Sequence, residues 1–352
     1  MKRVTLLKID KWWSTHYGTM LAFVYLVTAT SPTPPPLAKF LSTLGIFTIA
    51  VLGIGSFGQL LNDLTDVEQD ARTGARNILA TKGSASRMAL LATSLVVGIV
   101  PWWWLPTTPA VAALIAAEYA LFVLYSVPPF RLKERGFSGI VADALYAYVV
   151  PNAFAILLFA NLGDGTAPIY GLAATLAWCF CFGIERILFH ELLDAAADAR
   201  SGVRTFVVRR GWTQAFGIDL YVVVPLTTAA FVAMLTAWAP ISPILPVSYA
   251  VYAMLTICSY WGIRAVTRID ALSRIDRYHL VAERLICAFV WRWLGLCSLA
   301  TLVTKCPQYL PLVPLHLALF PQPITWARRH ALAEAVKLFR SCSGGGRSPT
   351  SA

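Results

Sequence analysis

The chain has 352 residues, of which 57% are hydrophobic and only 13% are charged, whereas a typical soluble domain has about 25% charged residues. With a mean hydropathy of +0.64, this composition excludes a soluble domain and indicates a polytopic membrane protein. Because a membrane protein carries excess basic residues in its cytoplasmic loops, the net charge of +11 reports topology, and no nucleic-acid partner is expected.

The chain begins with a basic segment, residues 1–13, whose terminal tryptophan pair is typical of an anchor at the cytoplasmic membrane interface. Apolar runs then recur, each of about 20 residues and long enough to cross the lipid bilayer. They lie near residues 14–31, 38–61, 87–104, 110–125, 138–160, 168–189, 214–238, 242–263 and 285–304. We therefore predict an all-α protein with a bundle of nine transmembrane helices, forming one membrane domain over residues 1–305.

Lysine and arginine fall almost entirely in the loops after the second, fourth, sixth and eighth runs. The positive-inside rule therefore places the N-terminus, and the acidic groups described below, on the cytoplasmic side. Residues 264–284 carry five arginines among apolar residues, as expected of an interfacial helix.

Residues 306–352 are predicted to form a C-terminal extension. Within it, residues 310–320 are apolar but too short to span, residues 326–340 form a basic and weakly amphipathic helix, and residues 341–352 are expected to be disordered. With nine spans, this basic segment falls on the side opposite the other basic loops. Two alternatives follow: the tail does not obey the positive-inside rule, or a re-entrant turn brings it back.

A dense polar group follows the second apolar run, with the sequence Q-L-L-N-D-L-T-D-V-E-Q-D-A-R-T-G-A-R-N-I-L-A-T-K at residues 59–82. Asn62, Asp66 and Asp70 are spaced four residues apart, so a helix places them on one face. Oxygen ligands in such a row suit a hard cation such as Mg²⁺. Arg72 and Arg76, just beyond, suit a phosphate group.

A second acidic group, with Glu191, Asp194 and Asp198 on one predicted helix face, follows the sixth run, and Arg200 and Arg204 come next. Two such helix ends facing each other would form a pocket in which two Mg²⁺ ions bridge the acidic side chains to a diphosphate. Charged residues are also ordinary in solvated loops. Two matching clusters at the ends of even-numbered spans favour a functional site, because acidic groups at membrane depth are costly.

Three motifs resemble those of the UbiA superfamily of intramembrane prenyltransferases. N-D-L-T-D-V-E-Q-D at residues 62–70 resembles the first aspartate-rich motif, NDxxDxxxD. E-L-L-D-A-A-A-D at residues 191–198 resembles the second, DxxDxxxD, with glutamate first. Y-S-V-P-P-F-R-L-K at residues 125–133 is similar to the stretch after the fourth helix. The chain differs at Arg76-Asn77, where the family often has Arg-Pro, and at Ala71, where many members have arginine.

The resemblance, over about residues 10–305, implies a Mg²⁺-dependent prenyltransferase of the bacterial cytoplasmic membrane, with its polar pocket facing the cytoplasm. It would ionise a prenyl diphosphate and transfer the prenyl group to an acceptor, expected to be aromatic. One Mg²⁺ would bind Asn62, Asp66 and Asp70, and the other Asp194 and Asp198, with Glu191 in a weaker role. The implied diphosphate contacts are Arg72, Arg76, Lys133 and Arg204. Tyr125 would stabilise positive charge at the allylic carbon, completing a catalytic group with the four aspartates.

Two alternatives remain open. A membrane terpene cyclase of the same superfamily would use the diphosphate site without an acceptor. A transporter would place charged residues near mid-span, where the sequence shows few candidates, namely Glu118, Asp143 and Arg292.

Two further residues have two interpretations each. Asp143 is either an acceptor-side base in the pocket or a hydrogen-bonding group of the helices, and His190 either touches the acceptor or only shapes the second motif.

The basic residues 131–133 are ordinary after a cytoplasmic span. The sequence names neither the acceptor nor the prenyl length.

Overall fold

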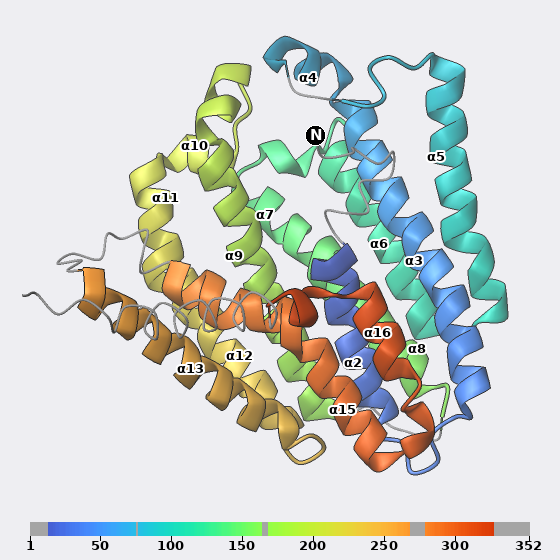
Figure 1. The fold of residues 1–352 in the computed structure, drawn as a ribbon. Helices are drawn as coiled ribbons and strands as arrows, with labels where there is room; N and C mark the ends of the chain where they lie inside the picture. Colours follow the sequence, from blue (N-terminus) through green and yellow to red (C-terminus); the bar gives the residue numbers. More distant parts are fainter. Residues whose placement is uncertain (1–12, 75–76, 164–167, 268–278, 327–352) are drawn as a thin grey trace, which may run out of the picture.

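A computed structural model describes residues 13–74, 77–163, 168–267 and 279–326, and every regular element within these ranges is helical (Figure 1). The first half contains η1 (Trp13–Tyr17), α2 (Gly18–Thr28), α3 (Leu37–Thr65), α4 (Val67–Thr73), α5 (Ser84–Ile99), η2 (Val100–Trp104), α6 (Pro109–Ser126), η3 (Leu132–Glu134), α7 (Phe137–Ala144), η4 (Leu145–Val149) and α8 (Val150–Ala160). The second half contains α9 (Ile169–Ser201), α10 (Phe206–Arg210), α11 (Trp212–Ile218), η5 (Asp219–Val223), α12 (Val224–Trp238), α13 (Ile244–Thr267), η6 (His279–Cys287), η7 (Val290–Leu294), α15 (Gly295–Lys305), η8 (Pro307–Tyr309) and α16 (Leu312–Leu319).

Seven helical segments of the described chain are long and apolar enough to cross a membrane, which makes this a multi-pass membrane protein. They coincide with the predicted second to seventh and ninth spans. The count of nine spans is not confirmed. The first predicted span forms η1 and α2, together 16 residues, which rise about 24 Å against a hydrocarbon core of about 30 Å. The eighth falls in α13, of which the structure describes the side chains of Ile244–Cys258.

The short helix α2 lies at the centre of the bundle. Every side chain from Thr19 to Thr28 is buried, and α2 packs against α8 on one side and α15 on the other. A helix that is apolar all round is covered either by other helices or by lipid, and the burial of every side chain within the protein shows that other helices cover α2. The first predicted span is therefore a core helix of the bundle.

Close helix packing fixes α3, which carries the first acidic motif. A Cβ atom added at Gly53 of α3 would lie 2.2 Å from the backbone nitrogen of Gly98 in α5. Since no side chain fits in that space, the paired glycines bring the two backbones into direct contact along the bundle.

Two spans change helix type just before a proline. The π-helical segment η4 precedes Pro151 in α8, and η5 precedes Pro225 in α12. Proline has no backbone N–H and disrupts the hydrogen bonds of the preceding turn, and π-helical turns absorb such disruptions. The first of these irregular turns borders the site described below.

The chain turns back after α15, and α16 packs against the bundle. Phe320 stacks on Trp13 with ring centroids 5.8 Å apart, and Tyr309 and Leu312 are buried. Residues 307–320 thus lie against η1, α2 and α15. The predicted disordered tail and all but the first residue of the predicted amphipathic helix lie outside the described residues, as do residues 268–278 of the predicted interfacial helix.

Both acidic motifs lie at the same end of the bundle. Figure 1 shows α4, which continues the first motif, and α10, which follows the second, at its upper end. The two meet because α4 packs against α9, the helix that carries the second motif. The fold therefore brings together two sequence segments that four predicted spans separate.

Candidate active site

A cavity of about 450 Å³ opens between the two motifs. All six predicted metal ligands line it: Asn62, Asp66, Asp70, Glu191, Asp194 and Asp198. Tyr125 and Lys133 line the same cavity. The structure thus gathers eight of the predicted site residues around one space.

The cavity continues from this acidic end into the bundle along α3. Its α3 wall follows the helical repeat from Asp66 through Asn62, Gly58 and Ile54 to Val51. Phe122 of α6, which lies against Gly58, and Phe154 of α8 add apolar surface. The space therefore has a charged entrance and a hydrophobic interior, the shape required by a molecule with an anionic head and a hydrocarbon tail.

The first motif crosses a break between two helices. α3 ends at Thr65, and Asp66, with φ −103° and ψ 0°, lies between α3 and α4. The i to i+4 hydrogen bonds nevertheless continue, because the Asp66 amide donates to the Asn62 carbonyl (3.1 Å) and the Asp70 amide to the Asp66 carbonyl (2.8 Å). The predicted common face of Asn62, Asp66 and Asp70 is thereby preserved.

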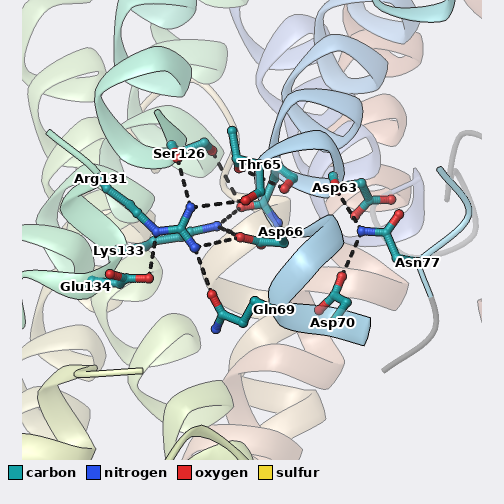
Figure 2. Close-up of polar contacts among 11 residues, drawn as sticks. Asp63, Thr65, Asp66, Gln69, Asp70, Asn77, Ser126, Arg131, Lys133 and Glu134 are labelled. Carbon is teal, nitrogen blue, oxygen red and sulfur yellow. Dashed lines mark hydrogen bonds and ion pairs between the residues drawn. The ribbon is translucent and has the colours of Figure 1, made fainter. Parts of the chain in front are cut away.

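A cationic cluster from the loop after α6 holds Asp66 (Figure 2). The Lys133 ammonium lies 2.6 Å from both carboxylate oxygens of Asp66 and 2.8 Å from Oδ1 of Asn62. Arg131 Nη2 donates to Asp66 Oδ1 (2.9 Å) and to Gln69 Oε1 (2.8 Å). Burial lowers the pKa of Lys133, and the adjacent Asp66 carboxylate opposes that effect.

Sequence reasoning missed Arg131, which it treated as an ordinary basic residue after a cytoplasmic span. Its backbone is left-handed, with φ 38°, and its guanidinium also contacts Glu134 Oε1 at 2.6 Å and the Thr65 carbonyl at 3.3 Å. Arg131 therefore ties the end of α3 to the loop after α6. The signal was present in the P-P-F-R-L-K stretch, which contains arginine as well as lysine.

Asn77, where the chain departs from the common family pattern, supports Asp70. Its Nδ2 atom donates to Asp70 Oδ2 (2.8 Å) and to the Asp63 carbonyl (2.7 Å), as Figure 2 shows. Its Oδ1 atom accepts from the Leu79 amide (2.9 Å). Proline has no side-chain amide, so Asn77 gives the first motif of this chain an orienting contact that proline cannot supply.

The second motif lies near the end of the long helix α9, which runs without interruption through all three acids. Asp194 is exposed and Asp198 is half-buried. Glu191 is buried, and its Oε2 accepts the Val207 amide (3.1 Å) in the first turn of α10. That contact stabilises an otherwise unpaired N–H at a helix start, so Glu191 fixes α10 as well as lining the cavity.

The aromatic wall of the cavity contains Tyr125 and Tyr146, whose rings meet edge to face with centroids 5.0 Å apart. The Tyr146 hydroxyl donates to Asp143 Oδ1. Asp143 is not among the lining residues, so the hydrogen-bonding interpretation of Asp143 agrees with its position. His190 is exposed and lines the cavity beside Glu191.

Three predicted diphosphate contacts are not placed in the cavity. Arg204 is exposed and is not among the lining residues, and its carbonyl accepts from Arg209 Nε (2.9 Å). The side chain of Arg72 and the whole of Arg76 lie outside the described part of the structure. Their predicted roles stay predictions.

More charges are buried within the spans than the three mid-span candidates identified in the sequence. Glu185, Arg186 and Asp219 are all buried. Arg186 Nη1 lies 2.5 Å from Glu283 Oε1 and 3.7 Å from Glu185 Oε1. This pairing joins α9 to η6 and compensates buried charge inside the bundle.

The cavity acids fit Mg²⁺ by their chemistry. Every predicted ligand atom is a carboxylate or amide oxygen, the donors that Mg²⁺ prefers, and Mg²⁺ commonly takes only one or two carboxylates besides substrate phosphate and water. Among the described residues no three His, Cys, Asp or Glu side chains are close enough to share one ion. The Lys133 ammonium, within 2.8 Å of three oxygens of Asn62 and Asp66, marks a position that already holds a cation.

The fold and the site define a membrane protein whose helical bundle presents two acidic motifs to one cavity. A family model, the UbiA prenyltransferase family, matches residues 18–293. The chain belongs to the UbiA prenyltransferase family, which confirms the predicted family and enzyme class.

Two curated relatives are called lycopene elongase/hydratase. The Haloarcula japonica protein is 27% identical over 181 residues, which are 51% of this chain and 57% of that protein. The Haloferax volcanii protein is 25% identical over 181 residues, 49% of this chain and 54% of that protein. The match thus spans little more than half the length of these relatives.

Two solved structures of a UbiA homolog from Archaeoglobus fulgidus share the fold. The one bound to GPP and Mg²⁺ aligns with a TM-score of 0.57 at 13% identity, and the alignment covers 88% of this chain and 99% of that chain. The one bound to DMAPP and Mg²⁺ aligns with a TM-score of 0.56 at the same identity and coverage.

Proposed function

We propose that this protein is a Mg²⁺-dependent prenyltransferase that ionises a prenyl diphosphate and transfers the prenyl group to an acceptor with accessible π electrons. The observation that carries the proposal is the convergence of both acidic motifs on one cavity with an apolar interior. The Archaeoglobus fulgidus structures support it, since the homolog binds GPP or DMAPP together with Mg²⁺.

The residues at the entrance bind the diphosphate head. Asn62, Asp66 and Asp70 hold one Mg²⁺, and Asp194 and Asp198 hold the other, with Glu191 assisting. Bound Mg²⁺ neutralises the negative charge that develops on the diphosphate as the allylic C–O bond breaks. Lys133 and Arg131, next to Asp66, add positive charge on the same side.

The inner cavity protects the allylic cation left by that cleavage. Tyr125 and Tyr146 present aromatic rings, which attract positive charge. The apolar lining from Ile54, Phe122 and Phe154 excludes bulk water that would otherwise capture the cation. These residues together favour attack by a bound acceptor.

The acceptor is one of two classes of molecule with accessible π electrons, an aromatic ring or a polyene. An aromatic ring is the acceptor expected from the sequence, whereas the names of the curated relatives add a polyene of the lycopene type. We propose that the cavity end that holds the acids faces the cytoplasm, because the described basic residues Arg131, Lys133 and Arg135 follow a span there.

We expect purified protein to release diphosphate from geranyl diphosphate in the presence of Mg²⁺, and a chelator to stop the release because the acids alone repel the substrate. Products are identified by mass, with prenyl diphosphates of several lengths and with aromatic and polyene acceptors supplied separately. Adding back excess Mg²⁺ is the control for reversible loss. Undiminished turnover in the chelator would contradict the proposed metal requirement.

The product assay and a separate flux measurement distinguish the two alternatives. A cyclic hydrocarbon formed without any acceptor would identify a terpene cyclase that uses the same diphosphate site. Solute flux through proteoliposomes without chemical turnover would identify a transporter.

Replacing Asn77 with alanine should weaken divalent metal binding about three- to tenfold, because Asp70 loses the amide that orients it. The loss of the two contacts to the Asp63 carbonyl and the Leu79 amide should also destabilise the protein by about 1–3 kcal/mol. Titration with Mn²⁺ followed by electron paramagnetic resonance measures the first effect, and thermal unfolding the second. A variant that melts lower but binds Mn²⁺ normally would limit Asn77 to a structural role.

A further inference from the structure

Glu118 is a buried acid in the apolar part of the cavity. It lies in the middle of α6, is 1% exposed and lines the cavity together with Phe122, one turn later in the helix. Among the described residues its Oε2 atom has no hydrogen-bond partner. The proposed diphosphate chemistry does not use it.

Such a group needs an explanation. Nearly all buried polar side-chain atoms in proteins have a hydrogen-bond partner, and an acid within a membrane span is costly unless it serves a purpose. Other buried charges lie in the spans. Arg186 is compensated by Glu283, whereas Asp219 is buried with both carboxylate oxygens unpartnered among the described residues and does not line the cavity. Glu118 is different because it lines the cavity, so a molecule in the cavity can supply the missing partner.

The position of Glu118 separates it from the diphosphate end. Ser126, at the end of α6, lies 3.5 Å from Asn62 (Oγ to Oδ1). Glu118 lies eight residues before Ser126 in α6, which is about 12 Å along the helix axis. A ligand of Glu118 therefore sits well inside the bundle, beyond the proposed metals.

We propose that Glu118 forms a second subsite, at the inner end of the cavity, that binds an O–H group carried by the acceptor or by a water molecule. An apolar pocket with one placed polar group fixes the orientation of its ligand through that group. The subsite rests on the proposed prenyl transfer for its purpose. Its hydrogen-bonding specificity can be measured without any turnover.

Whether the acceptor carries the O–H group is tested by equilibrium binding to protein in nanodiscs. The probes are 4-nonylphenol and 4-nonyltoluene, which differ only in a hydroxyl or methyl group. We expect the wild type to bind the phenol about tenfold more tightly, as one buried hydrogen bond allows. Glu118→Leu should remove the preference, and Glu118→Gln, which keeps a hydrogen-bonding oxygen, should retain it. Val123→Ala, on a lipid-facing position of α6 that is 41% exposed, is the matched control.

Whether a water molecule carries the O–H group is tested with geranyl diphosphate and Mg²⁺ in ¹⁸O-labelled water without an acceptor. A water held by Glu118 adds its oxygen to the allylic cation and gives up a proton to the released diphosphate, so a labelled terpene alcohol forms. We expect Glu118→Leu to reduce the labelled alcohol at least tenfold relative to diphosphate released.

The two experiments together decide the inference. A phenol preference that Glu118→Leu removes assigns the O–H group to the acceptor, and a loss of labelled alcohol alone assigns it to water. Equal phenol affinity and equal labelling in the wild type and Glu118→Leu would overturn the subsite. If the wild type releases no diphosphate, the proposed function fails, and the binding experiment still decides the role of Glu118.

Discussion

Asp66→Asn is expected to lower turnover about a thousandfold while the protein stays folded. The carboxylate occupies the centre of the proposed site, where it contacts Lys133 at 2.6 Å and Arg131 at 2.9 Å. Asparagine keeps the shape but removes the negative charge that a divalent cation requires, and loss of one preorganised electrostatic contact at a reacting centre costs about 10²–10³ in rate. Because the substitution also removes a ligand of the proposed metal, we expect the loss of turnover to lie at the upper end of this range.

Asp66→Asn also leaves the partly buried Lys133 without its paired acid and Arg131 with Glu134 as its remaining acidic partner, so its thermal stability must be measured alongside turnover. Glu68→Gln is the matched control, because Glu68 belongs to the same acidic stretch but is exposed and does not line the cavity. We expect this control to keep wild-type turnover. Asp194→Ala, at an exposed position, should abolish turnover with little change in stability. Full activity in either aspartate variant would refute the proposed metal site.

The convergence of the two motifs could be predicted from local sequence patterns, namely the apolar length of each span and the spacing of the polar residues at its end. Apolar length marks the spans, and the four-residue spacing of Asn62, Asp66 and Asp70 survives the break between α3 and α4. The span count could not be predicted in the same way. A central helix and a lipid-facing helix are both apolar, so the run containing α2 gave no sign that it is short and enclosed by other helices.

The contacts that tune the site depend on tertiary structure. Asn77 looked like a loss relative to the family pattern, yet its amide reaches back to Asp70. Glu191 looked like a weaker metal ligand, and its carboxylate also holds the first turn of α10. Sequence spacing places residues on a helix face, but it does not show which loop folds back to meet that face.

Lys133→Met is expected to strengthen metal binding in the absence of diphosphate, by about tenfold, although it removes a proposed substrate contact. The Lys133 ammonium lies within 2.8 Å of three oxygens of Asn62 and Asp66, which are proposed metal ligands. A divalent ion that takes these oxygens must displace the ammonium, and like charges at such distances repel strongly. Without the lysine, this competition is absent.

The two effects of Lys133→Met have opposite signs, which distinguishes displacement from general damage to the site. In the wild type, inorganic diphosphate gives the displaced ammonium a new anionic partner, so diphosphate and metal should each strengthen the binding of the other by the same factor. In Lys133→Met, Mn²⁺ should bind more tightly alone and gain less from diphosphate, as electron paramagnetic resonance titrations with and without diphosphate would measure. Arg135→Met, at an exposed position of the same loop, should behave as the wild type. Unchanged or weaker binding of Mn²⁺ alone by Lys133→Met would show that the ammonium does not occupy the metal position, and the lysine would then act only on the diphosphate.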